Sequence, residues 1–218
     1  MTRIRHVFFD IGGVLATNGW DREQRKLAIE RFNLDPDDFQ NRHEEMVGPL
    51  EQGQISLEEY LDIAVFHEPR EFTKNEFRDF VFSQSKPYAE TIAIARAVAA
   101  GCTYWVMTMN NESEDLNRYR IETFGLNEVF DAFLSSCWLG LRKPARRFYD
   151  RALGISEARP KESVLIDDRP QNLEPARALG MHTIHFESSP QLARDLRALG
   201  VQTTARRRRA SSSSGAMR

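Results

Sequence analysis

The sequence contains few cysteines, and the two that it has, Cys102 and Cys137, lie far apart along its 218 residues. Two distant cysteines provide neither a zinc-binding pattern nor a disulfide framework, so a hydrophobic core must stabilise the fold. A chain with so few cysteines is typical of a reducing compartment. We therefore expect an intracellular, cytoplasmic protein.

Long apolar runs and an excess of charge of one sign are also missing. No apolar stretch approaches the length of a membrane span, and the start of the chain, Met1 to His6, lacks the pattern of a signal peptide. The net charge is −2, which gives no broad field for capturing DNA or an acidic membrane. We expect neither a nucleic acid nor a membrane as partner.

Short apolar runs alternate with amphipathic stretches along most of the chain. Strands that alternate with helices indicate a mainly parallel, doubly wound α/β sheet of the Rossmann-like type. Right-handed crossovers then place helices on both of its faces. The expected strands are 4–9, 103–109, 130–134, 164–166 and 183–186, and the expected helices between them are 90–100, 112–124, 145–153 and 173–179.

Residues 18–85 interrupt this alternation because they contain no strand-like run. Asp35-Pro36 is typical of a helix start, and Ser56 with Glu59 forms a capping box that starts another helix. We therefore predict an all-helical segment inserted after the first strand, and we call residues 18–85 the helical insert. The core then comprises residues 1–17 and 86–201.

The end of the chain, residues 202–218, has a composition that cannot form a core. Four arginines, 206–209, are followed by a run of serines, 211–214. Such a segment has nothing to bury, so we predict a disordered, solvated tail. A kinase site or a nucleic-acid contact is the less favoured interpretation.

An aspartate and two glycines directly follow the first expected strand. Ligands bind beyond the carboxyl ends of strands in open parallel sheets, and this is where Asp10 would lie. Gly12 and Gly13 would let the backbone turn sharply and approach a ligand closely. A plain turn explains the pattern equally well, so this motif alone does not decide between the two.

Polar residues also follow two other expected strands. Thr108 and the free amides after it could bind an anion at a helix N-terminus, although Thr108 and Asn111 could simply cap that helix, Asn111 together with Glu114. Asp167 and Asp168 repel each other after a buried run, and a Mg²⁺ ion would relieve this repulsion. A pair of helix-capping acids is the alternative.

A lysine precedes the helix expected at 145–153. The ammonium of Lys143 could neutralise a phosphoryl group there, whereas a solvated surface lysine is the commoner case. In a doubly wound sheet, Lys143 and the groups after the three strands can all converge on one edge. This convergence is the basis for a functional interpretation of the set.

Together these motifs resemble the haloacid dehalogenase superfamily, over about residues 4–186. The resemblance is closest to its phosphatase branch, which includes the N-terminal domain of soluble epoxide hydrolase and bacterial sugar-phosphate phosphatases. The helical insert has the position of the family's cap. The matching segments are 9–15, Thr108, Lys143-Pro144 with Phe148-Tyr149, and 167–172 with 176–181.

The resemblance implies a hydrolase that forms an aspartyl-phosphate. Asp10 would be the nucleophile, with Lys143 offsetting charge beside it and beside the phosphoryl group. Mg²⁺ would be held by Asp10, the Gly12 carbonyl and Asp168, with Asp167 behind Asp168 or acting through water. Phosphate oxygens would be bound by Thr108, the N–H of Met109 and Lys143, with Asn110 or Asn111 substituting for the asparagine that often stands at position 109.

One departure from the family's phosphatases concerns the leaving group. Gly12 stands where a second aspartate usually protonates the leaving oxygen, help that is worth roughly 10²- to 10⁴-fold in rate. We therefore expect slow turnover of ordinary alkyl phosphates unless another residue donates the proton. Candidates in the helical insert are His43, Glu44 and Glu45.

The leading hypothesis is thus a Mg²⁺-dependent phosphomonoesterase acting on a small phosphorylated metabolite. A metal-independent 2-haloacid dehalogenase, which uses the same nucleophile, and a non-catalytic module that binds Mg²⁺ and phosphate are the alternatives. The sequence leaves the substrate and the oligomeric state open. Plausible pocket residues of the helical insert are Trp20, Arg22, Arg42, His43 and Phe66.

Overall fold

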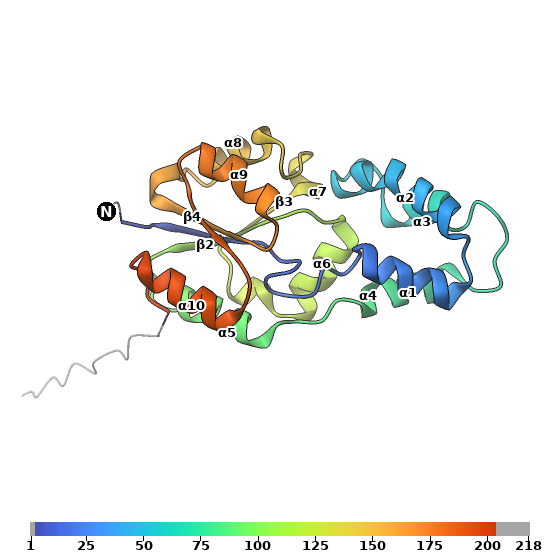
Figure 1. Ribbon diagram of the computed structural model, residues 1–218, viewed down its shortest axis with the longest axis horizontal. Coiled ribbons are helices and arrows are strands. Elements are labelled where there is room, and N and C mark those ends of the chain that lie inside the picture. Colours follow the sequence, from blue (N-terminus) through green and yellow to red (C-terminus); the bar gives the residue numbers. More distant parts are fainter. Residues whose placement is uncertain (1–2, 204–218) are drawn as a thin grey trace, which may run out of the picture.

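A computed structural model describes residues 3–203 of the chain (Figure 1). The tail predicted for 202–218 therefore lies outside the described residues, apart from its first two. Within the described part, no helix combines the length and the apolar character that crossing a membrane requires. Cys102 and Cys137 are both free.

Five parallel strands form one sheet in the order β3-β2-β1-β4-β5. The expected doubly wound α/β fold is confirmed. β1 lies at the centre, and its last residue, Phe9, pairs with Thr108 of β2 and Ile166 of β4. Asp10 therefore emerges between the ends of two neighbouring strands. The strands are β1 (His6–Phe9), β2 (Trp105–Asn110), β3 (Ala132–Ser135), β4 (Ser163–Asp167) and β5 (His182–His185).

Helices cover both faces of the sheet (Figure 1). Successive strand residues point to opposite faces, so Val7 and Phe9 pack under α5 and α10, whereas Phe8 packs under α8 and α9. These two apolar layers hold the strand ends in a fixed relation. The helices of this part are α5 (Ala89–Ala99), α6 (Glu114–Thr123), α7 (Ser136–Leu139), α8 (Arg146–Ile155), α9 (Pro170–Ala178) and α10 (Ser189–Ala198), with the 3₁₀ turns η1 (Leu126–Glu128) and η2 (Pro160–Glu162).

Residues 18–85 form helices with a hydrophobic cluster of their own, which includes Phe39, Tyr60 and Phe77. The predicted helix starts are confirmed: Asp35 caps α2, and Ser56 and Glu59 form the capping box of α3. The helices of the insert are α1 (Arg22–Phe32), α2 (Pro36–Glu51), α3 (Leu57–Ala64) and α4 (Lys74–Ser83). In Figure 1 they extend to one side of the sheet, beyond the carboxyl ends of the strands.

The end of α2 makes a close contact with α7. The Ser136 hydroxyl donates to the Glu51 carbonyl at 2.5 Å and accepts from the Glu112 N–H at 3.0 Å. Gly53 has a φ of +66°, and a Cβ there would lie 2.2 Å from the Cys137 carbonyl oxygen. The chain therefore requires a glycine at this point of contact.

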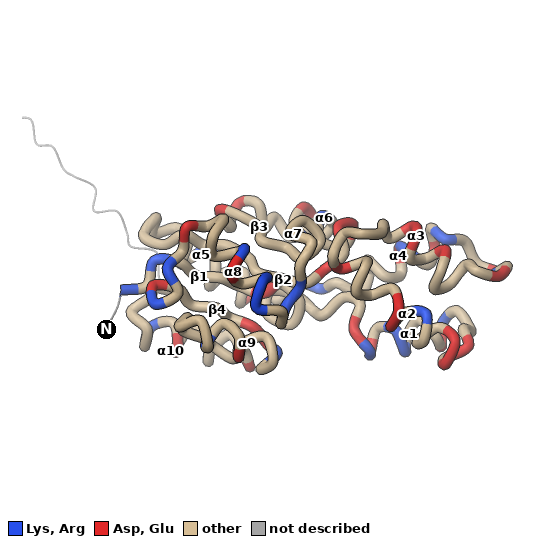
Figure 2. Tube along the Cα trace, turned by 90° about the horizontal axis from the view of Figure 1, so that it is seen from above, with Lys and Arg blue, Asp and Glu red and all other residues tan. Residues whose placement is uncertain are grey.

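Charges of both signs are interspersed along the described chain (Figure 2). This distribution agrees with the net charge of −2. Acidic and basic side chains are exposed together on the helices of the insert and on those around the sheet, and many of them form ion pairs, such as Lys26–Glu23 and Arg96–Glu128.

Candidate active site

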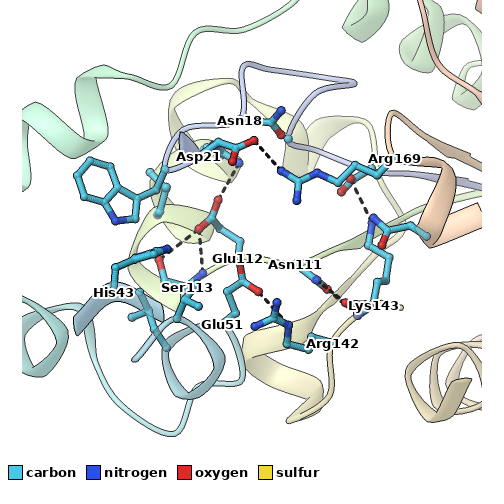
Figure 3. A pocket seen from close by; sticks show the side chains of 18 of the residues that line it. Asn18, Asp21, His43, Glu51, Asn111, Glu112, Ser113, Arg142, Lys143 and Arg169 are labelled. Carbon is cyan, nitrogen blue, oxygen red and sulfur yellow. Dashed lines mark hydrogen bonds and ion pairs between the residues drawn. The ribbon is translucent and has the colours of Figure 1, made fainter. Parts of the chain in front are cut away.

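A cavity of about 320 Å³ lies between the carboxyl edge of the sheet and the helical insert. Figure 3 shows side chains from both parts pointing into it. Asp10 and Gly12 after β1, Lys143 before α8 and Arg169 before α9 line its sheet side. This placement is the one expected for ligand sites in open α/β sheets.

Asp10 is almost completely buried at the base of the cavity. Its Oδ1 accepts a hydrogen bond from the Ile11 N–H at 2.8 Å, and its Oδ2 lies 3.1 Å from the Lys143 ammonium. Burial raises the pKa of Asp10, and the charges of Asp167 and Asp168 raise it further, while Lys143 opposes them. Because a cation is needed to keep Asp10 ionised, the surroundings of this group favour a metal ion.

Lys143 is fully buried rather than solvated. Its ammonium donates to the Asp167 carboxylate at 2.5 Å and to the Met109 carbonyl at 2.8 Å, in addition to its contact with Asp10. Nearby carboxylates raise the pKa of Lys143 against the opposing effect of burial, so the ammonium is charged at neutral pH. The ammonium thus contacts the ends of three strands, at Asp10 after β1, Met109 of β2 and Asp167 of β4.

Asn111 fixes the backbone of Lys143. The Asn111 amide donates to the Lys143 carbonyl at 2.9 Å and accepts from the Lys143 N–H at 2.8 Å. The expectation that Asn111 caps the following helix is wrong, because Ser113 is the N-cap of α6. The side chain that looked like a cap instead positions the lysine.

Asp167 has its hydrogen-bonding capacity filled. Oδ1 accepts from the Arg169 N–H at 2.9 Å and from the Asn172 amide at 3.0 Å, and Oδ2 accepts from Lys143 at 2.5 Å. A carboxylate with these partners is held in one orientation. Its geometry suits it to orient the lysine more than to bind a ligand directly.

Asp168 has one oxygen without a partner. Its Oδ1 is buried and makes no hydrogen bond within the described chain, and its Oδ2 lies 3.5 Å from the Asn18 amide. A Cβ on Gly13, which has a φ of +79°, would lie 2.2 Å from the Asp168 Oδ2. A glycine at position 13 therefore lets the loop after β1 lie close to the Asp168 carboxylate.

Three carboxylates meet at this edge, and Asp10, Asp167 and Asp168 can each place an oxygen within 4.8 Å of the others. With Lys143 as their one contacting ammonium, this group carries a formal charge of −2 (three negative charges and one positive). Buried charge of this size needs compensation. A divalent cation with oxygen ligands, of the Mg²⁺ type, fits both the charge and the unpartnered Asp168 oxygen.

Two side chains that were expected to bind phosphate, those of Thr108 and Asn110, lie within β2 and not in the cavity lining. The Asn110 side chain joins a buried network with Asn117 and Ser135, and the Thr108 hydroxyl lies 3.4 Å from the Asn110 side-chain oxygen. Neither side chain lines the cavity, and Met109 packs in the core under α8 and α9. The geometry does not support phosphate binding by the side chains of Thr108 and Asn110, because they point into the protein interior.

Two of the five residues named for the insert, Trp20 and His43, line the cavity, whereas Arg22, Arg42 and Phe66 do not. Phe66 packs in the insert's own cluster, and Arg42 pairs with Asp38 on the surface.

His43 is poorly suited to donate a proton. Its Nδ1 lies 2.9 Å from the Tyr60 hydroxyl, and burial lowers the pKa of His43 to about 3, so the ring is neutral at pH 7. Glu44 and Glu45 do not line the cavity. The geometry therefore favours none of the three candidates for the missing acid.

An ion pair beside Gly12 was not anticipated from the sequence. Arg120 of α6 is fully buried and pairs with the Glu112 carboxylate at 2.9 Å, while also donating to Ser85 and to the Thr17 carbonyl. A Cβ on Gly12 would lie 3.6 Å from the Arg120 Nη1 and 3.0 Å from the Asn18 Oδ1. An arginine in a polar helix gives no sequence signal of such burial.

Further ion pairs link the helical insert to loops of the sheet edge (Figure 3). Arg169 pairs with Asp21 at 2.7 Å, and Arg142 lies 3.3 Å from the Glu51 carboxylate. Burial raises the pKa of Glu51 to about 7. The cavity thus has a strongly charged lining on both sides.

The family profile of haloacid dehalogenase-like hydrolases matches residues 4–180 of the sequence. The chain belongs to the haloacid dehalogenase-like hydrolases. The resemblance inferred from the motifs is thereby confirmed, and with it the interpretation of the chain as a hydrolase.

Two curated relatives of this hydrolase are named for their activities. Bifunctional epoxide hydrolase 2 of Sus scrofa is 27% identical over 218 residues, a match that covers 91% of this chain and 39% of the pig protein. The hydrolase thus corresponds to well under half of that relative. Sesquiterpene phosphatase astK of Aspergillus oryzae is 24% identical over 191 residues, covering 87% of this chain and 83% of the relative.

Among solved structures, the HAD family enzyme BT-2542 of Bacteroides thetaiotaomicron superposes with a TM-score of 0.75 at 19% identity, over 89% of this chain and 99% of that one. A structure of BT-2542 with magnesium and inorganic phosphate gives a TM-score of 0.69 at 21% identity, over 84% and 94% of the two chains. At these identities the likeness establishes a shared fold.

Proposed function

We propose that this hydrolase is a Mg²⁺-dependent phosphomonoesterase that acts on a small phosphorylated metabolite through an aspartyl-phosphate at Asp10. The observation that carries the proposal is the convergence of Asp10, Lys143 and Asp168 at one edge of the sheet, where Asp10 and Lys143 line the cavity. The phosphatase name of one relative, and the magnesium and phosphate bound by BT-2542, are consistent with it.

The metal would be held by Asp10, the Gly12 carbonyl and the unpartnered oxygen of Asp168. When bound, Mg²⁺ would neutralise and polarise a phosphoryl oxygen. Asp167, whose oxygens are already hydrogen-bonded, would act by orienting Lys143.

In the first step, an Asp10 oxygen attacks phosphorus, and the bond from phosphorus to the leaving oxygen breaks. Lys143 favours the ionised form of Asp10 and stabilises the charge on the phosphoryl oxygens. In the second step, water attacks the aspartyl-phosphate, which releases inorganic phosphate and frees Asp10. Positioning and electrostatic stabilisation supply most of the rate in phosphoryl transfer, and the buried, mutually hydrogen-bonded groups at this edge are suited to both.

We further propose that the helical insert selects the substrate. It covers the cavity and contributes Trp20, Arg25 and His43 to the lining, and the loops opposite contribute Arg142 and Arg169. A small cavity with this many charged groups favours a polar phosphate ester over a long apolar one.

The dehalogenase alternative is less consistent with the site. Asp168 presents a buried carboxylate oxygen without a partner, which a metal-independent reaction would leave uncompensated. A purely binding role would leave unexplained the buried contact of Asp10 with Lys143, which prepares a carboxylate for attack.

The test is an assay of 4-nitrophenyl phosphate with Mg²⁺, with a chelator, and with Asp10→Asn. We expect phosphate release with Mg²⁺ and its loss with the chelator. Asp10→Asn should lose about 10⁴-fold or more, as for other nucleophile replacements. The matched control is Asp150→Asn, an exposed aspartate of α8, which should keep wild-type activity. Chloride release from a 2-haloacid without metal, in place of phosphate release, would contradict the proposal.

A further inference from the structure

Gly12 has no side chain that could donate a proton. Other side chains already fill the space that a side chain at position 12 would take. The direction of a Gly12 side chain leads to the Asn18 Oδ1 and the Arg120 guanidinium. Neither can act as an acid, since an amide oxygen has no proton to donate and a guanidinium stays protonated in proteins. A proton donor must therefore come from another part of the cavity.

Three carboxylates outside the metal-binding group line the cavity: Asp21, Glu51 and Glu112. Asp21 caps α1 and pairs with Arg169 at 2.7 Å. Burial raises the pKa of Glu112, but its carboxylate lies 2.9 Å from the Arg120 guanidinium and accepts a hydrogen bond from the Ser113 N–H at 3.0 Å, and both partners favour the ionised form. The carboxylates of Asp21 and Glu112 are thus each engaged by an arginine and by a backbone N–H.

Glu51 differs from both in its contacts. Its Oε2 is buried and has no hydrogen-bond partner within the described chain, although the Arg142 Nε lies 3.3 Å away in a geometry that does not form a hydrogen bond. Figure 3 shows its side chain on the cavity wall, beside Glu112 and Arg142. A buried carboxyl oxygen without a donor is the arrangement that tolerates a proton.

We propose that Glu51, at the end of α2, donates the leaving-group proton in place of the acid missing at position 12. This inference rests on the proposed phosphatase function. It makes the helical insert a contributor to the chemistry of the sheet edge as well as a cover for it.

The surroundings of Glu51 bring the pKa of its carboxyl close to neutral pH, where a proton donor is effective. Burial is the largest cause that raises its pKa to about 7, and Glu112 raises it further; Arg142, Arg169 and Lys143, from the loops that face it, lower it. An acid is most effective when its pKa lies near the working pH. A proton is therefore available on Glu51 at neutral pH.

Atoms and charge are conserved in the proton transfer from Glu51 to the leaving oxygen. As the Asp10 oxygen bonds to phosphorus, the bond from phosphorus to the substrate oxygen breaks, and that oxygen takes the proton of the Glu51 carboxyl to leave as an alcohol. Glu51 is then a carboxylate. It accepts a proton from the water that attacks the aspartyl-phosphate, which returns both Glu51 and Asp10 to their starting states.

The backbone around Glu51 is held in place by the core. The Ser136 hydroxyl bonds to the Glu51 carbonyl and to the Glu112 N–H, so one side chain connects the end of α2 to the loop after β2. Such a connection fixes the backbone from which the Glu51 side chain reaches the cavity wall, and a site on a fixed backbone suits a proton donor.

The experiment compares Glu51→Gln with wild type on two esters, phenyl phosphate and 4-nitrophenyl phosphate. Glutamine keeps the shape but carries no ionisable proton. We expect kcat for phenyl phosphate to fall about 10²-fold or more, and kcat for 4-nitrophenyl phosphate, whose leaving group needs no proton, to fall much less. The fall of wild-type kcat above pH 7 should disappear in the variant. Glu45→Gln, an exposed residue of the same helix, is the matched control and should behave as wild type.

Equal losses on the two esters would indicate a structural role and overturn the inference. So would an infrared difference spectrum, wild type minus Glu51→Gln, that shows no protonated carboxyl at pH 6. Activity that depends on Asp10 but is unchanged in Glu51→Gln would refute the role of Glu51 alone. Absence of any activity that depends on Asp10 would instead refute the phosphatase function.

Discussion

The two walls of the cavity hold their charges in different ways. On the sheet wall, Lys143 contacts Asp10 and Asp167, and these three side chains are at most 9% exposed. On the insert wall, Glu51 pairs with Arg142 of the facing loop, and these side chains are 23% and 37% exposed. Strand ends fix the first set through the backbone, whereas the second set depends on how the insert packs against the loops. The comparison suggests that the sheet wall determines the chemistry and the insert wall adjusts it.

The largest effect should follow removal of the charge on Lys143. Lys143→Met leaves buried carboxylates without their partner, and such a loss costs roughly 3–5 kcal/mol of stability at pH 7. The matched change in the insert is Lys74→Met, because Lys74 pairs with Asp62 at 2.6 Å on the surface. That change should cost far less, because an exposed ion pair contributes little to stability. Urea unfolding without metal measures both, and equal costs would show that the buried contacts of Lys143 stabilise the fold no more than a surface ion pair does.

The next effect concerns the glycine that faces Asp168. Gly13→Ala combines a positive φ with a Cβ 2.2 Å from the carboxylate, so we expect Mg²⁺ binding and activity to be lost together with roughly 1–3 kcal/mol of stability. Gly140→Ala is the control, since Gly140 has a φ of +65° but nothing within 4 Å. It should lose about 1 kcal/mol and keep its Mg²⁺ affinity by calorimetry. Retained Mg²⁺ affinity in Gly13→Ala would contradict the assignment of Asp168 as a ligand.

The pH dependence of stability should distinguish the insert wall. The pKa of Glu51 is raised in the folded state to about 7, so the stability that Glu51 contributes is present at low pH and is lost as pH rises from its ordinary value through 7. Glu51→Gln does not titrate, and should therefore be more stable than wild type by about 1–3 kcal/mol at pH 8 and equal to it at pH 4. Urea unfolding of metal-free protein at the two pH values is the measurement. A difference of the opposite sign would show that folding lowers the pKa of Glu51 instead of raising it.

The smallest effect is expected outside the cavity. Arg42 makes an exposed ion pair with Asp38 one helical turn away. Arg42→Ala should change stability by about 0.5 kcal/mol or less and leave KM unchanged. A clear rise in KM would mean that the insert wall extends further than the lining residues indicate.

The strand ends could be predicted from sequence because each carries a local signal. Asp10 and Asp167 directly follow apolar runs, and the order of strands and helices then brings them to one edge. Lys143 was predicted from its place before a helix. The physical reason for success is that a parallel sheet converts position along the chain into position in space.

The remaining groups depend on contacts between distant segments, which no local pattern encodes. Asn111 resembled a helix cap, yet its amide pairs with the Lys143 backbone 32 residues away. Arg120 resembled a surface residue of a polar helix, yet it is buried against Ser85 and the Thr17 carbonyl. Glu51 gives no signal in the sequence, because its raised pKa arises from burial in the folded protein.

The glycine at position 53 has a mechanical consequence. A Cβ at position 53 would lie 2.2 Å from the Cys137 carbonyl oxygen. Even one methyl group there would therefore push α7 and the turn after α2 apart. Water admitted by that separation would solvate the Glu51 carboxyl and return its pKa toward the ordinary value. With Glu51 as the proposed proton donor, a single added carbon at position 53 would then shift the pH optimum of the hydrolase to more acidic values.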